Sequence, residues 1–273
     1  MTDRYAALGF PMGHAKSPRI HAMFARQTGQ DLRYDAIETP PGRFRSAVDA
    51  FRAAGGRGIN VTVPFKIEAH AYAGELTERA QRAGAVNCIA FVDGQAIGEN
   101  FDGVGLVRDI RHNLGVPMAN RRVLLLGAGG AARGALMPLV EQRPATLVLA
   151  NRTAARAQVL AKGFGTAGSL VAVDYAQLGS QQFDLVLNAT SASINDELPP
   201  VPRSAFAPGC LAYDLSYCRG LTPFLALARD AGAGQLADGI GMLVEQAAEA
   251  FAWWRGVRPD TAPVIRAFAV SVI

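Results

Sequence analysis

The chain has few of the residues that build disulfide frameworks or metal centres. It contains three cysteines and four histidines in 273 residues, and Cys88, Cys210 and Cys218 form no C-x-x-C pair. An odd number of scattered thiols does not make a disulfide scaffold, and no His, Cys, Asp or Glu cluster has metal-site spacing. We therefore expect reduced thiols, a cytoplasmic protein and no bound metal.

Long apolar runs and runs of like charge are missing as well. No apolar segment reaches the roughly 18 residues that a bilayer span requires, and "MTDRYAALGF" is not a signal peptide. The net charge is +4 and the arginines are scattered, which argues against a nucleic-acid partner. A G-x-S-x-G elbow is absent, so serine hydrolase chemistry has no support. We expect a small-molecule substrate, no membrane or nucleic acid, and a monomer or homodimer.

Half of the residues are apolar and 18% are charged, which is typical of a globular chain long enough for two domains. The first part alternates strand-like and helix-like segments. Strands are predicted over 5–10, 32–39 and 58–64, and helices over 17–29 and 42–56, with Ser17 as an N-cap. A helix and a hairpin with the turn "VDGQ" follow. This alternation predicts an α/β sheet that is largely parallel.

The alternation restarts at residue 103. A helix is predicted over 104–115, and a strand, a glycine loop and a helix over 121–142. Further predicted elements are strands over 146–153, 183–191 and 210–217, a helix over 154–165, and a C-terminal helix that Gly256 and Pro259 end. The second half therefore predicts a doubly wound sheet of the Rossmann type, over about residues 103–239.

The loop in "VLLLGAGGAARGA" suits a nucleotide. Gly127 allows a tight turn out of the strand, and Gly129 lets the main chain approach a pyrophosphate. The amide groups at the start of the next helix would then face the anion. The alternative is an ordinary glycine-rich turn between a strand and a helix, but the strand-loop-helix context favours cofactor binding.

The next strand predicts which dinucleotide is bound. An NAD enzyme usually has Asp or Glu after this strand to bind the ribose 2′-hydroxyl. This chain has Asn151, Arg152, Thr153 and Arg156 instead. Guanidinium groups hold a 2′-phosphate by charge-assisted hydrogen bonds, which a carboxylate would repel. The sequence therefore favours NADP over NAD.

Polar residues follow the strands of the first domain. Lys66 ends "NVTVPFK", and Asp102 lies in the glycine-rich stretch "GENFDGVG". Ligands bind at the carboxyl ends of strands in open α/β sheets, so the two residues are candidates for a proton-transfer pair. A lysine after a strand is otherwise a surface residue, and an aspartate before glycine is a common turn former. His14 is a weaker candidate acid or base, and His21 is expected to be packed.

Ten stretches together resemble the shikimate dehydrogenase family over the whole chain. They are "PMGHAKSPRIHAMF", "NVTVPFK", "GAVNCI", "ENFDGVG", "LLLGAGGAARG", "NRTAAR", "NATS", "YDLSY", "TPFL" and "DGIGMLVEQAAEAFAWWRG". The resemblance implies NADP-dependent interconversion of 3-dehydroshikimate and shikimate, in the formation of chorismate and aromatic amino acids. It also implies a substrate-binding domain over 1–102 and about 240–273, completed by C-terminal helices that return to it.

The same resemblance assigns roles residue by residue. Lys66 and Asp102 become the catalytic pair, with Lys66 as the acid or base. Substrate contacts fall on Ser17, Thr62, Asn87, Tyr217 and Gln246. Cofactor contacts fall on Gly127, Ala128, Gly129, Gly130, Ala131, Asn151, Arg152, Thr153 and Arg156, with Leu215 and Gly239 beside the nicotinamide.

Three stretches depart from the pattern usual in the family. Ser-x-Ser before the first helix is replaced by Ala15-Lys16-Ser17, which removes one hydroxyl for the substrate carboxylate. That hydrogen bond is worth about 1.5–3 kcal/mol if nothing, such as Lys16, replaces it. Asn-Thr-Asp-Gly is replaced by Asn100-Phe101-Asp102-Gly103, and the residues after "NATS" read "ASIND" over 192–196. The Phe101 ring is expected to fill space near the substrate or nicotinamide, or to pack beneath Asp102.

Three hypotheses about function follow from these observations. The first is a shikimate dehydrogenase. The second is a paralogue that oxidises quinate or another shikimate-like ring acid, because the carboxylate end of the pocket is altered. The third is an NADP-binding regulator without catalysis, against which the Lys66 and Asp102 pair argues.

Overall fold

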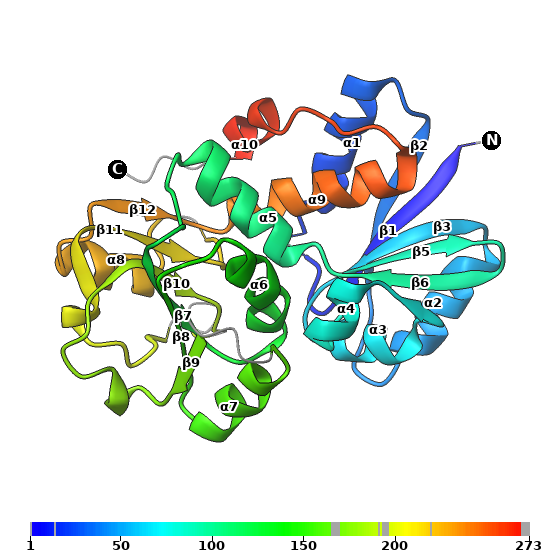
Figure 1. Ribbon diagram of the computed structural model, residues 1–273. Helices are drawn as coiled ribbons and strands as arrows, with labels where there is room; N and C mark the ends of the chain where they lie inside the picture. The colour runs from blue at the N-terminus through cyan, green and yellow to red at the C-terminus, as the bar shows by residue number, and fades with distance from the viewer. Residues whose placement is uncertain are drawn as a thin grey trace. The chain divides into compact units, whose positions relative to one another are not determined.

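The computed structural model describes residues 2–13, 15–164, 170–190, 192, 197–218 and 220–268. His14 and residues 193–196, both noted in the sequence, lie outside these ranges. The chain divides into two compact units (Figure 1). Unit 1 comprises Met1–Gly105 and Val244–Ala267, and unit 2 comprises Leu106–Leu243 and Phe268–Ile273. The C-terminal segment thus returns to the first unit.

Unit 1 is built on a six-stranded mixed sheet in the order β2-β1-β3-β5-β6-β4. The strands are β1 (Asp3–Gly9), β2 (Leu32–Glu38), β3 (Gly56–Val61), β4 (Glu75–Leu76), β5 (Cys88–Val92) and β6 (Gln95–Glu99). Strand β1 is parallel to β2 and β3, whereas β5 is antiparallel to β3 and β6. The largely parallel alternation predicted from the sequence is therefore confirmed for β1 to β3, and the predicted hairpin is β5–β6.

Helices cover both faces of this sheet. They are α1 (Ser17–Thr28), α2 (Phe44–Ala53), α3 (Lys66–Tyr72), α4 (Glu78–Ala83), α9 (Ile240–Arg255) and α10 (Ala262–Phe268). Successive residues of a strand face opposite sides, so Leu8 packs with Phe44 of α2, whereas Tyr5 stacks on Trp254 of α9 at 4.7 Å. Figure 1 shows α2 and α3 on one side of the sheet, with α1 and α9 on the other.

Local backbone geometry confirms two predictions and corrects one. Asp93 and Gly94 both have positive φ, at 47° and 76°, as the tight hairpin turn requires. Helix α9 ends at Arg255, and Gly256 follows with φ 71°. The prediction that Ser17 caps α1 is wrong, because Ser17 is already helical and Lys16 is the N-cap residue, without a side-chain cap. Pro18 fixes φ at the helix start, and the first turn begins one residue earlier than expected.

Unit 2 contains a six-stranded, fully parallel sheet in the order β12-β11-β10-β7-β8-β9. The strands are β7 (Arg122–Leu126), β8 (Thr146–Ala150), β9 (Leu170–Val173), β10 (Phe183–Asn188), β11 (Phe206–Asp214) and β12 (Gln235–Ala237). The chain runs outward from β7 to β9 and then returns to continue from β10, beside β7. This is the strand order of a Rossmann sheet, with its switch point between β7 and β10, and it confirms the predicted fold class.

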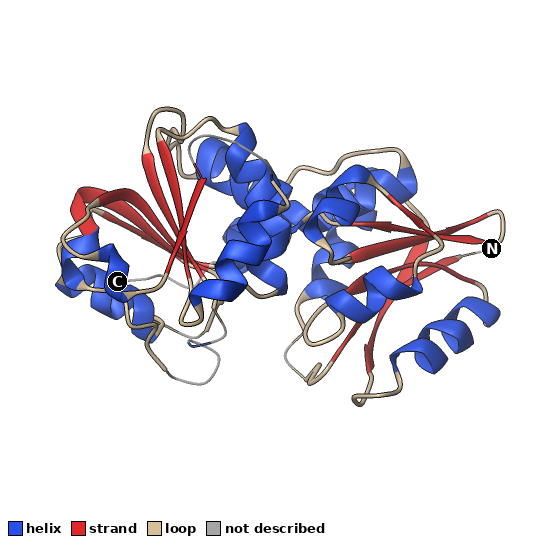
Figure 2. Ribbon diagram, turned by 60° about the horizontal axis from the view of Figure 1, so that its bottom comes forward, coloured by secondary structure: helices blue, strands red, loops and turns tan. Residues whose placement is uncertain are grey.

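The unit 2 helices pack on both faces of the sheet (Figure 2). They are α5 (Asp102–Arg108), continued by a π-helical turn over Asp109–Asn113, α6 (Gly130–Glu141), α7 (Ala154–Lys162) and α8 (Pro223–Asp230). Val123 and Leu125 of β7 face α6 and α7, whereas Leu124 and Leu126 belong to the core that includes Phe224 of α8. Strands buried on both sides read as the continuous apolar runs seen in the sequence.

Candidate active site and cofactor loop

One edge of the unit 1 sheet gathers the polar residues noted in the sequence. Strand β5 runs antiparallel to β3 and β6, so the end of β3, the start of β5 and the end of β6 meet at the same edge. Lys66 begins α3 shortly after β3, Asn87 precedes β5, and Asp102 begins α5 shortly after β6. The topology therefore brings together three residues that lie up to 36 positions apart.

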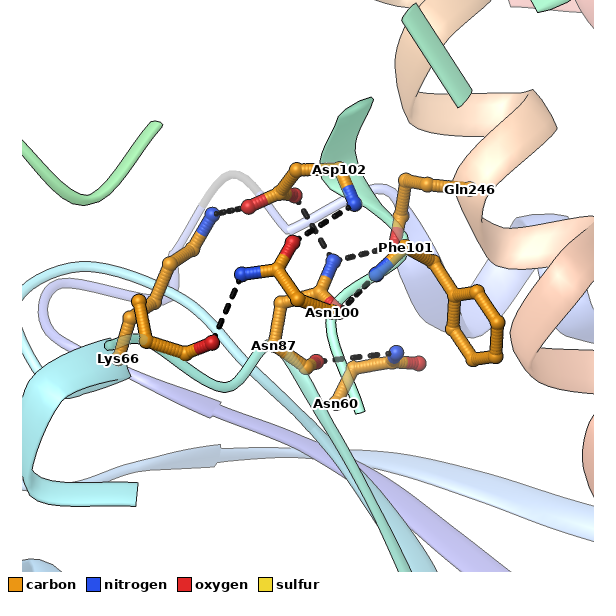
Figure 3. A network of polar contacts seen from close by, with 8 residues as sticks. Asn60, Lys66, Asn87, Asn100, Phe101, Asp102 and Gln246 are labelled. Carbon is orange, nitrogen blue, oxygen red and sulfur yellow. Dashed lines mark hydrogen bonds and ion pairs between the residues drawn. The ribbon is translucent and has the colours of Figure 1, made fainter. Parts of the chain in front are cut away.

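Lys66 and Asp102 are in direct contact (Figure 3). The Lys66 Nζ donates to Asp102 Oδ2 at 2.5 Å, and the side chains are 17% and 6% exposed. The second carboxylate oxygen, Oδ1, accepts a hydrogen bond from Asn87 Nδ2 at 2.8 Å. Both Asp102 carboxylate oxygens thus accept a hydrogen bond, and Lys66 is the more exposed of the two side chains. Removing one member of such a largely buried ion pair is strongly destabilising, because the other charge is left without its partner.

The Asn87 side chain is fixed in one orientation. Its Oδ1 accepts the main-chain N–H of Phe101 at 2.8 Å, so the Nδ2 group must face Asp102 and Gln246. The contact from Nδ2 to Gln246 Oε1 is 3.3 Å. Asn60 donates to the Asn87 carbonyl at 3.3 Å and supports the same residue from below. Four predicted site residues therefore form one network, namely Lys66, Asp102, Asn87 and Gln246 (Figure 3).

A second set of polar residues anchors the Asp102 turn, and the sequence assigned these residues no role. Asn100 Oδ1 accepts the Asp102 N–H at 3.1 Å, and Asn100 Nδ2 donates to the Ala85 carbonyl at 2.9 Å. Glu99 accepts the Asn100 N–H at 2.7 Å and pairs with Arg79 at 2.7 Å. The only sequence signal for this anchoring role is that Asn100 lies close to Asp102. Ala85 and Arg79, which complete the set, come from other parts of the chain.

Ser17 and Thr62 lie at the same sheet edge, but neither joins this network within the described residues. Ser17 is half-buried at the start of α1. Thr62 follows β3, and its N–H donates to the Leu8 carbonyl at 2.9 Å. Their hydroxyls remain candidate substrate contacts.

The Phe101 side chain does not point toward the Lys66 and Asp102 pair. Figure 3 shows its ring directed away from Lys66, toward α9. It is 4% exposed and packs with Cys88, Ala250 and Trp253. Of the two positions expected for the ring, packing beneath the Asp102 turn is the one that describes these contacts.

His21 is buried as expected, within an aromatic cluster. Its ring stacks on Tyr34 at 4.0 Å, and neither ring nitrogen has a hydrogen-bond partner in the described part of the chain. Burial lowers the pKa of His21 to about 3, although the neighbouring Asn60 side chain acts in the opposite direction. The imidazole is therefore neutral at ordinary pH and is not an acid catalyst.

In unit 2 the glycine loop leaves room for an anion. Gly127 has φ 104°, and a Cβ there would lie 3.0 Å from the Ala189 carbonyl at the end of β10. Gly129 precedes α6, and a Cβ on it would meet nothing within 4 Å, so a ligand can approach the main chain. Helix α6 has no side-chain cap and no acidic residue in its first turn. These features fit a pyrophosphate over Gly127 to Ala131.

The segment after β8 fits a phosphate on the ribose. Arg152 and Arg156 are exposed, and neither is paired with a carboxylate among the described residues. Thr153 is the N-cap of α7 and makes no side-chain cap, while Asn151 Nδ2 donates to the Thr153 carbonyl at 2.9 Å. Two unpaired cations next to a helix N-terminus oppose the helix dipole, and a bound anion would relieve that repulsion.

Leu215 and Gly239 are neighbours in unit 2. The Gly239 N–H donates to the Ser216 carbonyl at 3.0 Å, and a Cβ on Gly239 would lie 2.1 Å from the Leu215 carbonyl. Only glycine fits at position 239, so the main chain at Gly239 packs directly against the main chain at Leu215. Tyr217 lies two residues beyond Leu215, and burial together with the charge of Asp238 raises its pKa.

The described residues contain no group of three His, Cys, Asp or Glu side chains that could hold a metal ion. No described helix has the length and apolarity of a membrane span. Cys88 and Cys210 are buried thiols, and Cys218 is an exposed thiol.

Three family models match the chain. Residues 7–89 match the shikimate dehydrogenase substrate binding domain, and residues 110–196 match shikimate/quinate 5-dehydrogenase. Residues 239–267 match the shikimate 5′-dehydrogenase C-terminal domain.

Relatives match along nearly the full length. The shikimate dehydrogenase (NADP⁺) of Nitrosospira multiformis is 57% identical, over 97% of this chain and 96% of its own. The crystal structure of an Ael1 enzyme from Pseudomonas putida is 52% identical, covers both chains completely and has a TM-score of 0.94. The shikimate 5-dehydrogenase of Thermus thermophilus, in complex with NADP(H) and shikimate, is 34% identical with a TM-score of 0.86, covering 97% and 98% of the two chains.

Proposed function

Because the chain belongs to the shikimate dehydrogenase family, we propose that it catalyses the reversible NADP-dependent reduction of 3-dehydroshikimate to shikimate. It is an oxidoreductase that acts on a CH–OH group. The reaction supplies shikimate for the formation of chorismate and the aromatic amino acids. The observation that carries this proposal is the partly buried contact of 2.5 Å between Lys66 and Asp102.

We assign proton transfer to Lys66. Its Nζ is the more exposed member of the pair and carries the protons that a nascent alkoxide needs. In the reductive direction Lys66 donates a proton to the oxygen that becomes the hydroxyl, and in the oxidative direction it takes that proton back. Bound NADPH supplies the hydride that completes the reduction.

Asp102 orients Lys66 and accepts a hydrogen bond from a substrate hydroxyl in this proposal. Its carboxylate is held by Asn87 on the side opposite to Lys66, which keeps the Nζ in one place. A fixed acid lowers the entropy cost of reaching the reactive geometry. The remaining substrate contacts are assigned to Ser17, Thr62, Asn87, Tyr217 and Gln246.

The cofactor residues are assigned to unit 2. The main chain from Gly127 to Ala131 binds the pyrophosphate, and Asn151, Arg152, Thr153 and Arg156 bind the ribose and its 2′-phosphate. Leu215 and Gly239 lie beside the nicotinamide in this assignment. The open space at Gly129 supports it, as do the Arg152 and Arg156 guanidinium groups, which pair with no carboxylate in the described part of the chain.

Initial rates with two ring acids and two cofactors test the proposal. The altered carboxylate end, with Ala15 in place of a serine, makes quinate the natural competitor. We expect turnover of shikimate with NADP⁺, and slower rates with quinate or with NAD⁺. No shikimate turnover at millimolar substrate would overturn the assignment, and a higher kcat/KM for quinate would favour the paralogue.

We also propose that the enzyme acts in the cytoplasm as a monomer or homodimer. The Cys88, Cys210 and Cys218 side chains form no disulfide among the described residues, which suits a reducing compartment.

A further inference from the structure

Phe101 links the polar network of unit 1 to its apolar core. Its main-chain N–H donates to Asn87 Oδ1 at 2.8 Å, and Asp102 is the next residue along the chain. Its side chain lies in the cluster with Cys88, Ala250 and Trp253. The same residue is therefore part of the hydrogen-bond network through its backbone and part of the core through its ring (Figure 3).

The Phe101 ring is held on two sides. Trp253 of α9 meets it edge-on, with ring centroids 5.8 Å apart and an interplanar angle of 70°. The guanidinium carbon of Arg79, on α4, lies 5.6 Å from the ring centroid. Edge-to-face and cation–π contacts each restrict the ring to a narrow set of positions. A ring fixed in this way also fixes the main chain at residue 101.

Arg79 is itself held by a buried carboxylate. Its Nη2 and Nε donate to the two carboxylate oxygens of Glu99, at 2.7 Å and 3.3 Å. Glu99 is 4% exposed, and its Oε1 also accepts the N–H of Asn100. A bidentate guanidinium–carboxylate pair has a defined geometry, so the Arg79 group lies over the ring in a set position. Each residue from Glu99 to Asp102 is consequently anchored.

We propose that Phe101 is a positioning residue for Asp102 and Asn87. The ring contacts Arg79 and Trp253 and thereby fixes the position of the Phe101 main-chain N–H, which orients the Asn87 side chain. Asn87 in turn holds the carboxylate that faces Lys66. The inference rests on the proposed function, in which Lys66 and Asp102 do the chemistry. A smaller side chain at 101 lets the turn relax, and the Lys66 to Asp102 geometry relaxes with it.

Phe91 provides a matched control for Phe101. It lies on β5 of the same sheet, is 9% exposed, and has the Arg52 guanidinium carbon 5.6 Å from its ring centroid. Its main chain is paired with Ala96 in the hairpin ladder, not with a site residue. The two phenylalanines thus share burial and a cation–π partner, and differ in what their backbone holds.

The experiment compares Phe101→Leu with Phe91→Leu. Both variants should have lower melting temperatures, because each leaves a cavity in a core. Only Phe101→Leu should lower kcat for shikimate oxidation, on the order of ten- to a hundredfold, which is the range expected when a catalytic group is displaced by a fraction of an ångström to an ångström. KM for shikimate should change less than kcat, and the Kd of NADP⁺ should stay within twofold in both variants.

Arg79→Lys is a second variant that keeps the charge and changes a partly exposed side chain. It removes the bidentate pair with Glu99 and the planar group over the ring. We expect a several-fold lower kcat with little change in melting temperature.

Equal kcat values in the two leucine variants, or an unchanged kcat in Arg79→Lys, would overturn the positioning role. Wild-type turnover of shikimate in the same assay would then leave the proposed function standing. Absence of wild-type turnover is a separate result, and it counts against the function itself.

Discussion

The Asn87 amide shows how a single side chain can organise a site. Its oxygen and one of its N–H groups are used within unit 1, by the Phe101 amide and the Asp102 carboxylate. The longer contact to Gln246, at 3.3 Å, is the weaker one. The support that Asn87 gives to Asp102 is therefore compatible with the substrate contact proposed for Asn87, because a hydroxyl in the place of Gln246 would leave the bond to Asp102 intact.

His21 makes the folded state sensitive to acid. Its pKa is lowered to about 3 from the ordinary 6.5, so between these values the unfolded chain binds a proton that the folded chain does not. Stability therefore falls as pH decreases below 6.5. At pH 5 the difference amounts to about 2 kcal/mol relative to neutral pH. Chemical unfolding at pH 7 and at pH 5 measures this difference in the free energy of unfolding.

The variant His21→Phe should remove that loss of stability, because it keeps an aromatic ring against Tyr34 and binds no proton. The exposed His112→Gln serves as the control and should retain the wild-type slope. A wild-type slope in His21→Phe would show that other groups cause the acid sensitivity.

At the scale of elements, the proposed cofactor assignment places the 2′-phosphate at the N-terminus of α7. Its first turn has no acidic residue and contains Arg156, and Arg152 lies just before it. We expect Arg152→Ser with Arg156→Ser to raise KM for NADP⁺ roughly ten- to a hundredfold, which corresponds to about 1.4–2.7 kcal/mol. This is less than two full charge-assisted hydrogen bonds would contribute, because both arginines are exposed and water weakens their interactions. KM for NAD⁺ should change little, because NAD⁺ lacks the 2′-phosphate.

Steady-state kinetics with both cofactors provide the measurement. Arg229→Ala, on α8 and paired with Asp230, is the control for loss of an exposed arginine. An equal rise in KM for NADP⁺ and NAD⁺ in the double variant would contradict the assignment.

Strong apolar runs and punctuating residues made most elements predictable from the sequence. The runs at 123–126 and 185–187 are buried parallel strands, and the Asp93-Gly94 turn closes its hairpin as predicted. Helix α8 was missed although Thr222 caps it and Pro223 opens it, a signal present in "TPFL". Helix α3 was missed because its seven residues are too few for a periodic pattern and begin only two positions after Pro64. The π-helical turn over Asp109–Asn113 has no sequence signal.

The candidate site was predictable only in part, for a topological reason. Lys66 and Asp102 were predicted because each follows a strand. In a sheet built from alternating strands and helices, ligands bind at the carboxyl ends of the strands. The partners Glu99, Asn100 and Arg79 depend on the side-chain packing of α4 against β6, which no local pattern reveals. The direction of the Phe101 ring could not be predicted from the neighbouring residues in the sequence, because the ring packs against Trp253, more than 150 positions away.

At the scale of the whole molecule, the chain consists of two units with separate cores, and the proposed catalytic and cofactor-binding roles fall in different units. Unit 1 holds the Lys66 and Asp102 pair, and unit 2 holds the glycine loop and the α7 arginines. A substitution that disables proton transfer in unit 1 should therefore leave the cofactor affinity of unit 2 unchanged. Proton transfer by Lys66 can therefore be tested separately from cofactor binding.

That test is Lys66→Ala, assayed for shikimate-dependent NADPH formation and for NADP⁺ binding on the same preparation. We expect a loss of kcat of about 10²–10⁴-fold, which is the contribution of a positioned acid or base, with the Kd of NADP⁺ within twofold of wild type. Turnover close to the wild-type rate in a folded Lys66→Ala protein that binds NADP⁺ normally would contradict the claim that Lys66 transfers the proton.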